Sequence, residues 1–107
     1  DPGIEITPVT VFRKPNSSST HTELYQTLVS VIHQYNARAL VVPLLDSGYT
    51  ESQMYRQLGI NCYGFVPIEV TPEVDATEHA ANERVPVEQI RRGVKMLYEV
   101  VARIEQP

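Results

Sequence analysis

The chain has 107 residues, of which 42% are hydrophobic and 21% are charged, and its formal net charge is −4. This length suits one small domain with a core of its own. An acidic chain without a basic patch argues against nucleic acid as a partner. Since no apolar run approaches 18 residues, we expect no membrane segment.

Both the cysteine usage and the first residues bear on the compartment. Cys62 is the single cysteine, which excludes an internal disulfide, and we expect it to be a buried strand residue. The sequence begins with Asp1 and Pro2 rather than Met. We therefore expect the true N-terminus to be missing, which leaves a soluble cytoplasmic and a secreted location both open.

The first predicted element is a strand over residues 4–12, where Ile and Val alternate with mostly polar residues. Pro8 lacks a backbone N–H group, which favours an edge strand or a bulge. Residues 13–19, with Pro15 and three serines, are typical of a crossing between two structural units.

A helix is predicted from about residue 22 to residue 35. Thr20 and Glu23 have the spacing of a capping box. The apolar residues that recur behind it at helical spacing are Leu24, Leu28, Val31, Ile32 and Tyr35. We interpret His21 and His33 as exposed polar residues of this helix.

Residues 39–43 form a continuous apolar run, which favours a strand covered on both faces. A second capping box at residues 50–53 predicts a short helix over about 51–58, ended by Gly59. We predict a further buried strand at 61–66 and an irregular segment at 67–78.

The last predicted element is a helix over residues 87–104, with Pro86 in its first turn. Its predicted core stripe is Val87, Ile90, Val94, Leu97, Val101 and Ile104. Its predicted solvent-facing residues are Arg91, Arg92, Lys95 and Glu99. The alternation of strands and helices predicts an α/β fold, a sheet covered by helices.

Polar groups are dense just before this last helix. His79, Asn82 and Arg84 lie between Glu78 and Pro86, and two alanines follow the histidine. Loops on a rigid scaffold often carry sites, and neutral imidazole is the commonest metal ligand. The alternative interpretation of His79 is a solvated side chain among acidic neighbours.

At these residues the sequence resembles a known family. The resemblance rests on the run HAANERVPVEQIRRGVKMLYEVV and on a second block at residues 47–60 that contains SGYTES, YR and LGI. Both are similar, in order and spacing, to motifs of the dizinc metallopeptidases that include aminoacylase, glutamate carboxypeptidase and succinyl-diaminopimelate desuccinylase. The resemblance covers about residues 16–105.

The resemblance implies a role for His79 as the family's last zinc ligand, holding one of two zinc ions. It implies that Gly48, Tyr49 and Thr50 contact the substrate. Thr50 is also the predicted helix cap, and both roles stay open. The remaining polar residues of the loop are then supporting or structural groups: Glu78, Asn82, Glu83 and Arg84. For Arg84 we favour an ion pair with a carboxylate.

The family's other zinc ligands and its general base are absent from this sequence, so no catalytic residue is assigned within residues 1–107. The chain resembles the C-terminal third of such an enzyme. Residues 1–13 would be the end of an inserted lid domain or a lead-in strand, and residues 14–107 the C-terminal part of the catalytic domain. Tyr49 and Glu51 depart from the family's usual small residue and aspartate.

The implied function is that of part of a zinc-dependent hydrolase, a metallopeptidase, carboxypeptidase or aminoacylase, which cleaves an amide bond in a peptide or N-acyl amino acid. It would be inactive without the N-terminal part of the same protein, and the lid domain would allow a homodimer. The alternative is a non-catalytic α/β binding or assembly module that has kept the fold. Zinc-ligand motifs upstream would distinguish the two.

Overall fold

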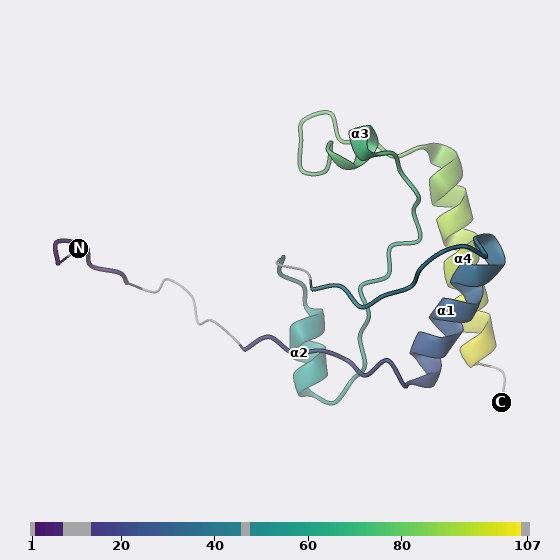
Figure 1. Cartoon of the computed structure of the whole chain (residues 1–107), viewed down its shortest axis with the longest axis horizontal. Coiled ribbons are helices and arrows are strands. Elements are labelled where there is room, and N and C mark those ends of the chain that lie inside the picture. The colour runs from purple at the N-terminus through teal and green to yellow at the C-terminus, as the bar shows by residue number, and fades with distance from the viewer. Residues whose placement is uncertain (1, 8–13, 46–47, 106–107) are drawn as a thin grey trace.

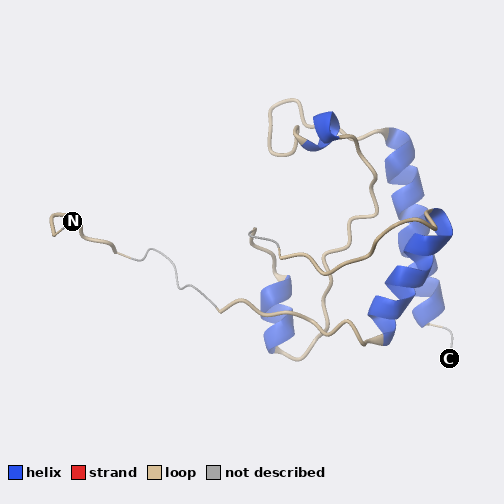
Figure 2. Ribbon diagram, viewed as in Figure 1, coloured by secondary structure: helices blue, strands red, loops and turns tan. Residues whose placement is uncertain are grey.

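The computed structural model describes residues 2–7, 14–45 and 48–105. Within these ranges the chain forms four helices, namely α1 (Glu23–Tyr35), α2 (Ser52–Gln57), α3 (Pro72–Asp75) and α4 (Val87–Ile104). The same ranges contain no β-strand (Figures 1 and 2). The predicted α/β fold with a sheet covered by helices is therefore wrong for the described residues.

The core lies between α1 and α4, which run side by side (Figure 1). Leu28 and Val31 of α1 meet Met96 and Val100 of α4, and Val31 is fully buried. Further apolar side chains pack around this cluster from α1 and from the segment after α2: Leu24, Ile32, Tyr35, Tyr63 and Phe65. A helix pair of this kind buries one apolar stripe of each helix.

Gly93 lets the loop before α3 approach α4 closely. A Cβ atom built on Gly93 would lie 2.8 Å from the carbonyl oxygen of Pro67 and 3.3 Å from its Cγ. No side chain fits at that distance without moving backbone atoms. The absence of a side chain at Gly93 therefore lets residues 65–69 cross directly against the backbone of α4.

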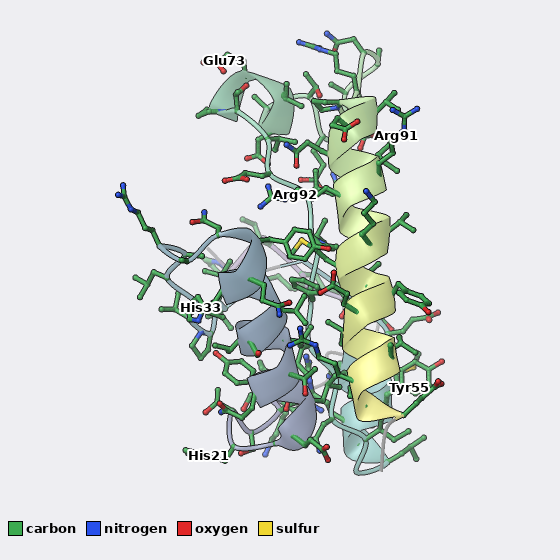
Figure 3. All side chains as sticks on the ribbon, turned by 90° about the vertical axis from the view of Figure 1, so that its right-hand side faces the viewer. His21, His33, Tyr55, Glu73, Arg91 and Arg92 are labelled. Carbon is green, nitrogen blue, oxygen red and sulfur yellow. The ribbon has the colours of Figure 1, made fainter. Side chains whose placement is uncertain are left out.

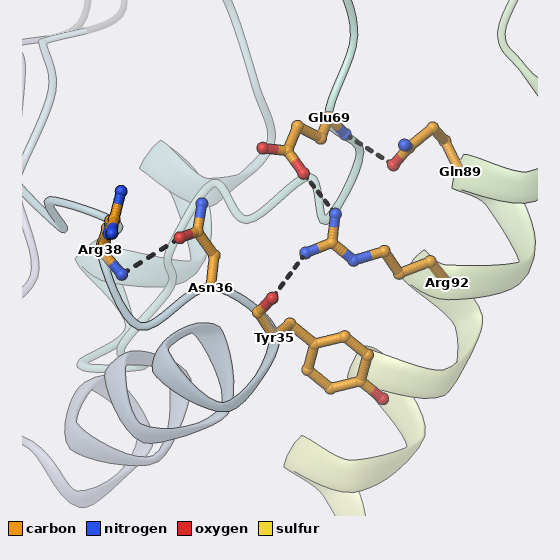
Figure 4. A network of polar contacts seen from close by, with 6 residues as sticks. All are labelled: Tyr35, Asn36, Arg38, Glu69, Gln89 and Arg92. Atoms are coloured by element: carbon orange, nitrogen blue, oxygen red, sulfur yellow. Dashed lines mark hydrogen bonds and ion pairs between the residues drawn. The ribbon is translucent and has the colours of Figure 1, made fainter.

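Polar side chains connect α1, α4 and the crossing loop (Figure 4). The hydroxyl of Tyr35 donates to Glu99 Oε1 at 2.6 Å. Arg92 donates to the Glu69 carboxylate and, at 3.2 Å, to the carbonyl oxygen of Tyr35, and its guanidinium lies 5.6 Å from the centre of the Tyr35 ring. The prediction that Arg92 and Glu99 face solvent is therefore wrong, because they bind α1 and its neighbouring loop.

The predicted core stripe of α4 is also exposed rather than buried. Its six residues are between 40% and 63% exposed, whereas the buried residues of the helix are Gly93, Met96 and Val100. We call the exposed set, Val87, Ile90, Val94, Leu97, Val101 and Ile104, the apolar face of α4. Helical periodicity identified an apolar side correctly, but α1 packs on the side next to it.

The two predicted inner strands are irregular segments instead. A strand requires a neighbouring strand to bond its backbone. Cys62, predicted to be buried in a strand, is half-buried, and its backbone is bound by side chains. Ser18 Oγ accepts from the Cys62 N–H at 2.9 Å, and Arg56 donates to the Cys62 carbonyl oxygen at 2.8 Å. Leu40, in the run 39–43, is largely exposed.

The predicted N-terminal strand falls partly on residues 8–13, which lie outside the described residues. Residues 4–7 are exposed and form no strand. No neighbouring segment pairs with them there, and alternation of residue types cannot supply one.

Helix positions agree with prediction better than the capping details do. The bounds predicted for α4 are confirmed, as is the end of α1 at Tyr35 and the ending of α2 at Gly59, which has φ +82°. Thr22 rather than Thr20 caps α1, because its hydroxyl accepts from the N–H of Tyr25 at 3.1 Å. The capping box predicted at residues 50–53 is not formed. Glu51 occupies the N-cap position of α2 and makes no side-chain cap bond, and the Gln53 side chain donates to the carbonyl oxygen of Lys14.

Helix α3 lies in the segment predicted to be irregular. Thr71 precedes it in an extended conformation and Pro72 occupies its first turn. Threonine followed by proline and an acidic residue is a helix-start signal, so the sequence did contain the information.

Candidate functional site

The loop that carries His79 is a series of tight turns after α3. Backbone bonds run from the Glu78 N–H to the Asp75 carbonyl at 3.0 Å and from the Ala80 N–H to the Thr77 carbonyl at 3.0 Å. His79 has φ +61°, the one non-glycine residue with positive φ in the described part of the chain. A left-handed backbone is unfavourable for a residue with a side chain, so the surrounding bonds must hold it.

The side chain of Thr77 joins the two sides of this loop. It is 6% exposed, and its hydroxyl donates to the Val74 carbonyl oxygen at 2.6 Å. The same hydroxyl oxygen accepts from the N–H of Arg84 at 3.3 Å. One side chain therefore connects the end of α3 to the far side of the loop. Sequence reasoning missed Thr77, because nothing in its sequence context marks a threonine as buried.

The other polar residues of the loop face solvent. Glu78, Asn82, Glu83 and Arg84 are all exposed. Arg84 Nη1 donates to the carbonyl oxygen of Asn82 at 3.3 Å, and within the described ranges it makes no ion pair. The predicted Arg84–carboxylate pair is thus replaced by a bond to backbone within the same loop.

His79 has the donor chemistry of a zinc ligand, but it stands alone. Its residue is exposed, and its imidazole makes no hydrogen bond or ion pair to any residue that the structure describes. A catalytic zinc takes three protein ligands. Residues 2–7, 14–45 and 48–105 contain no group of three His, Cys, Asp or Glu side chains that could hold a metal ion. Among the described residues His79 is therefore a single candidate donor, and no metal site is complete.

The predicted substrate-contacting residues lie elsewhere. Gly48, Tyr49 and Thr50 border a wide hollow of about 1280 Å³ between α2, α1 and the segments on either side of them. Part of its wall is apolar, formed by residues 41–45, Leu28 and Phe65. His79 is not among the lining residues. The structure therefore does not bring the predicted metal ligand and the predicted substrate residues to one site.

A polar cluster closes one side of this hollow. Arg56 Nε donates to Ser18 Oγ at 3.1 Å, and both side chains bind the backbone of Cys62. Tyr63 donates from its hydroxyl to the Ser19 carbonyl at 2.6 Å, and its ring lies 5.5 Å from that of Tyr25. These contacts join the connection before α1 to the segment after α2. In them Arg56 has a structural role, because its guanidinium binds Ser18 and the Cys62 carbonyl oxygen.

The other two histidines are peripheral. His21 and His33 are both exposed, as predicted, and lie near opposite ends of α1 (Figure 3). His33 Nε2 lies 3.0 Å from the Ala39 carbonyl oxygen. Neither is part of a metal-binding group among the described residues.

One carboxyl group near the His79 loop has a shifted pKa. The hydroxyl of Thr71 donates to the Glu73 carboxylate and lowers its pKa below the usual value, and a backbone hydrogen bond acts in the same direction. Glu73 lies on the exposed side of α3 (Figure 3). It stabilises the start of this short helix and stays ionised at neutral pH.

Among the helices that the structure describes, none combines the length and apolar character required to cross a bilayer.

Comparison with known proteins assigns the chain to a family. The profile of peptidase family M20/M25/M40 matches residues 3–103. The chain is 32% identical over 78 residues to the human N-fatty-acyl-amino acid synthase/hydrolase PM20D1, and equally to the protein of that name from Bos taurus. No solved structure matches the chain.

The matched residues are 73% of this chain but only 15% of each relative. The chain thus spans a small part of the length of the curated relatives it matches. The family match, in contrast, extends over nearly all of its residues and confirms the resemblance seen in the two sequence blocks. This chain belongs to peptidase family M20/M25/M40.

Proposed function

We propose that this chain is part of a zinc-dependent amide hydrolase and that it contributes His79 as a metal ligand. The observation that carries the proposal is the conformation of His79, a left-handed histidine in the turns between α3 and α4, a loop whose two sides are joined by the Thr77 hydroxyl. Strained residues persist where the surrounding structure over-determines them, and they cluster at functional sites. The exposed, unbonded imidazole is free to meet a metal.

The proposed substrate is an N-acyl amino acid or a peptide. Two observations support an acyl group of apolar character. The human relative is called an N-fatty-acyl-amino acid synthase/hydrolase. The hollow bordered by Gly48, Tyr49 and Thr50 has apolar residues along its wall. In this proposal those three residues contact the polar part of the substrate.

The remaining zinc ligands and the general base must come from another part of an M20 protein, because the described residues bring together only one donor. Bound zinc would supply Lewis acidity toward the amide carbonyl and lower the pKa of a water molecule. The role of this chain's residues is to present the His79 imidazole at a fixed backbone position and to border the substrate.

The test replaces His79 by asparagine in the protein assembled with the rest of an M20 catalytic domain. Asparagine tolerates positive φ better than most residues, so the loop should persist while the imidazole is lost. His79→Asn should remove about one zinc per site, counted by mass spectrometry, and lower turnover of an N-acyl amino acid by orders of magnitude.

The matched control is His21→Asn, which removes an exposed imidazole from the start of α1 and should change neither quantity. If His79→Asn keeps two zinc ions and near-normal turnover, His79 is not a ligand.

A second candidate function is a non-catalytic binding or assembly module. It is favoured by the separation of His79 from the hollow and by the absence of a three-donor group among the described residues. Under this alternative the assembled wild-type protein holds no zinc and hydrolyses no N-acyl amino acid, so the same measurement decides between the two.

A further inference from the structure

The connection before α1 contains a modification motif that the proposed function does not use. Asn16, Ser17 and Ser18 form the pattern Asn-X-Ser in which X is not proline, the acceptor pattern for N-linked glycosylation. Three other asparagines lack serine or threonine two positions on: Asn36, Asn61 and Asn82. The pattern therefore marks Asn16 as the single candidate acceptor in the sequence.

The folded chain uses the acceptor amide for its own contacts. Residues 14–19 run past α2 (Figure 1), and Asn16 Nδ2 donates to the carbonyl oxygen of Gln53 in α2 at 2.9 Å. Asn16 Oδ1 is closed to solvent and accepts no hydrogen bond from any residue that the structure describes. An amide is planar, and its two carbon substituents lie trans to one another. The first sugar on Nδ2 would therefore lie beside Oδ1, at a place that water does not reach.

The hydroxyl that completes the motif is occupied as well. Ser18 Oγ donates to the Cys62 carbonyl oxygen at 3.0 Å and accepts from the Cys62 N–H at 2.9 Å. Arg56 Nε donates to the same Ser18 oxygen at 3.1 Å. Because the motif requires serine or threonine at this position, the hydroxyl is part of what the transferase recognises. Both groups that the motif supplies are thus withdrawn when residues 14–19 pack on α2 and on the segment after it.

We infer that Asn16 is an acceptor for an N-linked oligosaccharide in the unfolded chain and that folding closes this site. In the transfer, the bond between the anomeric carbon and the diphosphate of a lipid-linked oligosaccharide breaks. Nδ2 bonds to that carbon and loses one proton, and the lipid diphosphate leaves. Folding and modification then compete for one amide. A glycan attached first holds residues 14–19 off α2, whereas folding first keeps Asn16 unmodified.

The experiment offers the folded full chain to a purified oligosaccharyltransferase with its lipid-linked donor and follows the increase in mass. A peptide of residues 14–21 is the unfolded reference. The matched control is Asn16→Gln with Arg84→Thr, which moves the motif to Asn82, an exposed residue of the loop before α4. Arg84 contacts Thr77 through its backbone N–H, so that bond survives the substitution.

We expect the peptide and the control chain to be modified at comparable rates. Folded wild type should be modified roughly tenfold or more slowly, because several hydrogen bonds must open together. Arg56→Ala removes one partner of Ser18 and should speed modification of Asn16 in the folded chain. A folded wild type modified as fast as the peptide would overturn the proposal. So would a peptide that is not modified, a control chain as slow as wild type, or an Arg56→Ala chain no faster than wild type.

Hydrogen exchange measures the opposite effect, that of the glycan on the fold. The full chain is synthesised with an added secretion signal and separated into glycosylated and unmodified fractions. In the unmodified fraction the bond to Ser18 Oγ protects the Cys62 N–H, and in the glycosylated fraction this hydrogen should exchange roughly tenfold faster or more. Equal protection in the two fractions would show that the glycan fits on the folded chain and would overturn the proposal.

Discussion

His79 holds a backbone conformation that costs a residue with a side chain about 1–2 kcal/mol. Two bonds to one hydroxyl, that of Thr77, join Val74 to Arg84 across the loop in which His79 lies. The loop that carries the candidate ligand is therefore joined across its width by one buried side chain.

Thr77→Val should loosen this loop without unfolding the chain. Valine keeps the buried volume but removes the hydroxyl, which leaves the Val74 carbonyl and the Arg84 N–H without that partner. The loss should be about 1 kcal/mol, so exchange of the Arg84 amide hydrogen should become roughly fivefold faster.

Thr77→Ser is the rescue variant, because serine keeps the hydroxyl. Hydrogen exchange followed by NMR makes the comparison. Arg84 protection that survives in Thr77→Val would show that the turns alone hold the loop.

At the scale of elements, α4 is joined to the crossing loop by close backbone approach and to α1 and that loop by polar bonds. Gly93 meets the crossing loop at Pro67, and Tyr35 binds Glu99 while Arg92 binds Glu69. Apolar contacts between the helices are few, since Leu28, Val31, Met96 and Val100 are the buried hydrophobic residues of the described chain. A single substitution at one of these contacts should therefore measurably lower the free energy of unfolding.

Gly93→Ala should destabilise the chain although alanine favours helices. The propensity gain of about 1 kcal/mol is outweighed, because the new methyl group meets the Pro67 carbonyl oxygen at 2.8 Å and the backbone must shift. We expect a net loss of about 1–2 kcal/mol in urea unfolding.

Gly64→Ala is the control for this prediction, because a Cβ at Gly64 meets no atom within 4 Å. It should change the free energy of unfolding little, or raise it slightly by restricting the unfolded chain. A Gly93→Ala protein as stable as wild type would mean that the loop is not held against α4.

The contribution of Tyr35 to the stability of the fold should depend on pH in the alkaline range. Its hydrogen bond to Glu99 raises the pKa of the phenol above 10.0, desolvation and the Glu99 charge add to the rise, and Arg92 opposes it. A raised folded-state pKa means that the contribution to stability is complete below the unfolded pKa. It is lost as the pH rises through the higher folded value.

The check is an absorbance titration at the phenolate band, taken as the difference between wild type and Tyr35→Phe to isolate one of six tyrosines. The isolated phenol should ionise above pH 10, and Glu99→Ala should bring its pKa down. A Tyr35 phenol that ionises at or below its ordinary pKa would contradict the role of Glu99.

At the scale of the molecule, 42% of the residues are hydrophobic, but the buried core of the described residues is very small. Most large apolar side chains of the described residues are exposed, both along α4 and in the segment that includes Leu40, Leu44 and Leu45. Burial of such surface is the main stabilising contribution in a folded protein. The chain by itself should therefore be marginally stable, and a partner that covers this surface should stabilise it.

Residues 1–107 alone should not hydrolyse an N-acyl amino acid when zinc is added. The described residues bring one histidine donor to the loop before α4 and no further ligand near it. An assay at saturating zinc, with His79→Asn as the blank, makes the measurement. Turnover that His79→Asn abolishes would show that the chain completes a metal site unaided.

The sequence by itself determined the family and the three longer helices, while α3 was predicted as irregular. Helical periodicity and the residues at helix ends are local signals, so α1, α2 and α4 were predicted at nearly their observed bounds. The motif around His79 was sufficient to identify the family that the profile match confirms. The position of the candidate ligand, in a loop immediately before a helix, followed from the same residues.

Only the tertiary structure decided which surfaces are covered. The apolar spacing of α4 shows that one side of the helix avoids water, but the Gly93–Pro67 contact and the polar bonds of Arg92 and Glu99 placed α1 on the adjacent side. Segments 39–43 and 61–66 have strand-like composition, yet a strand exists only where a second strand bonds its backbone, and composition cannot provide that partner. The left-handed conformation of His79 and the burial of Thr77 likewise belong to the turns that follow α3, which the sequence did not predict.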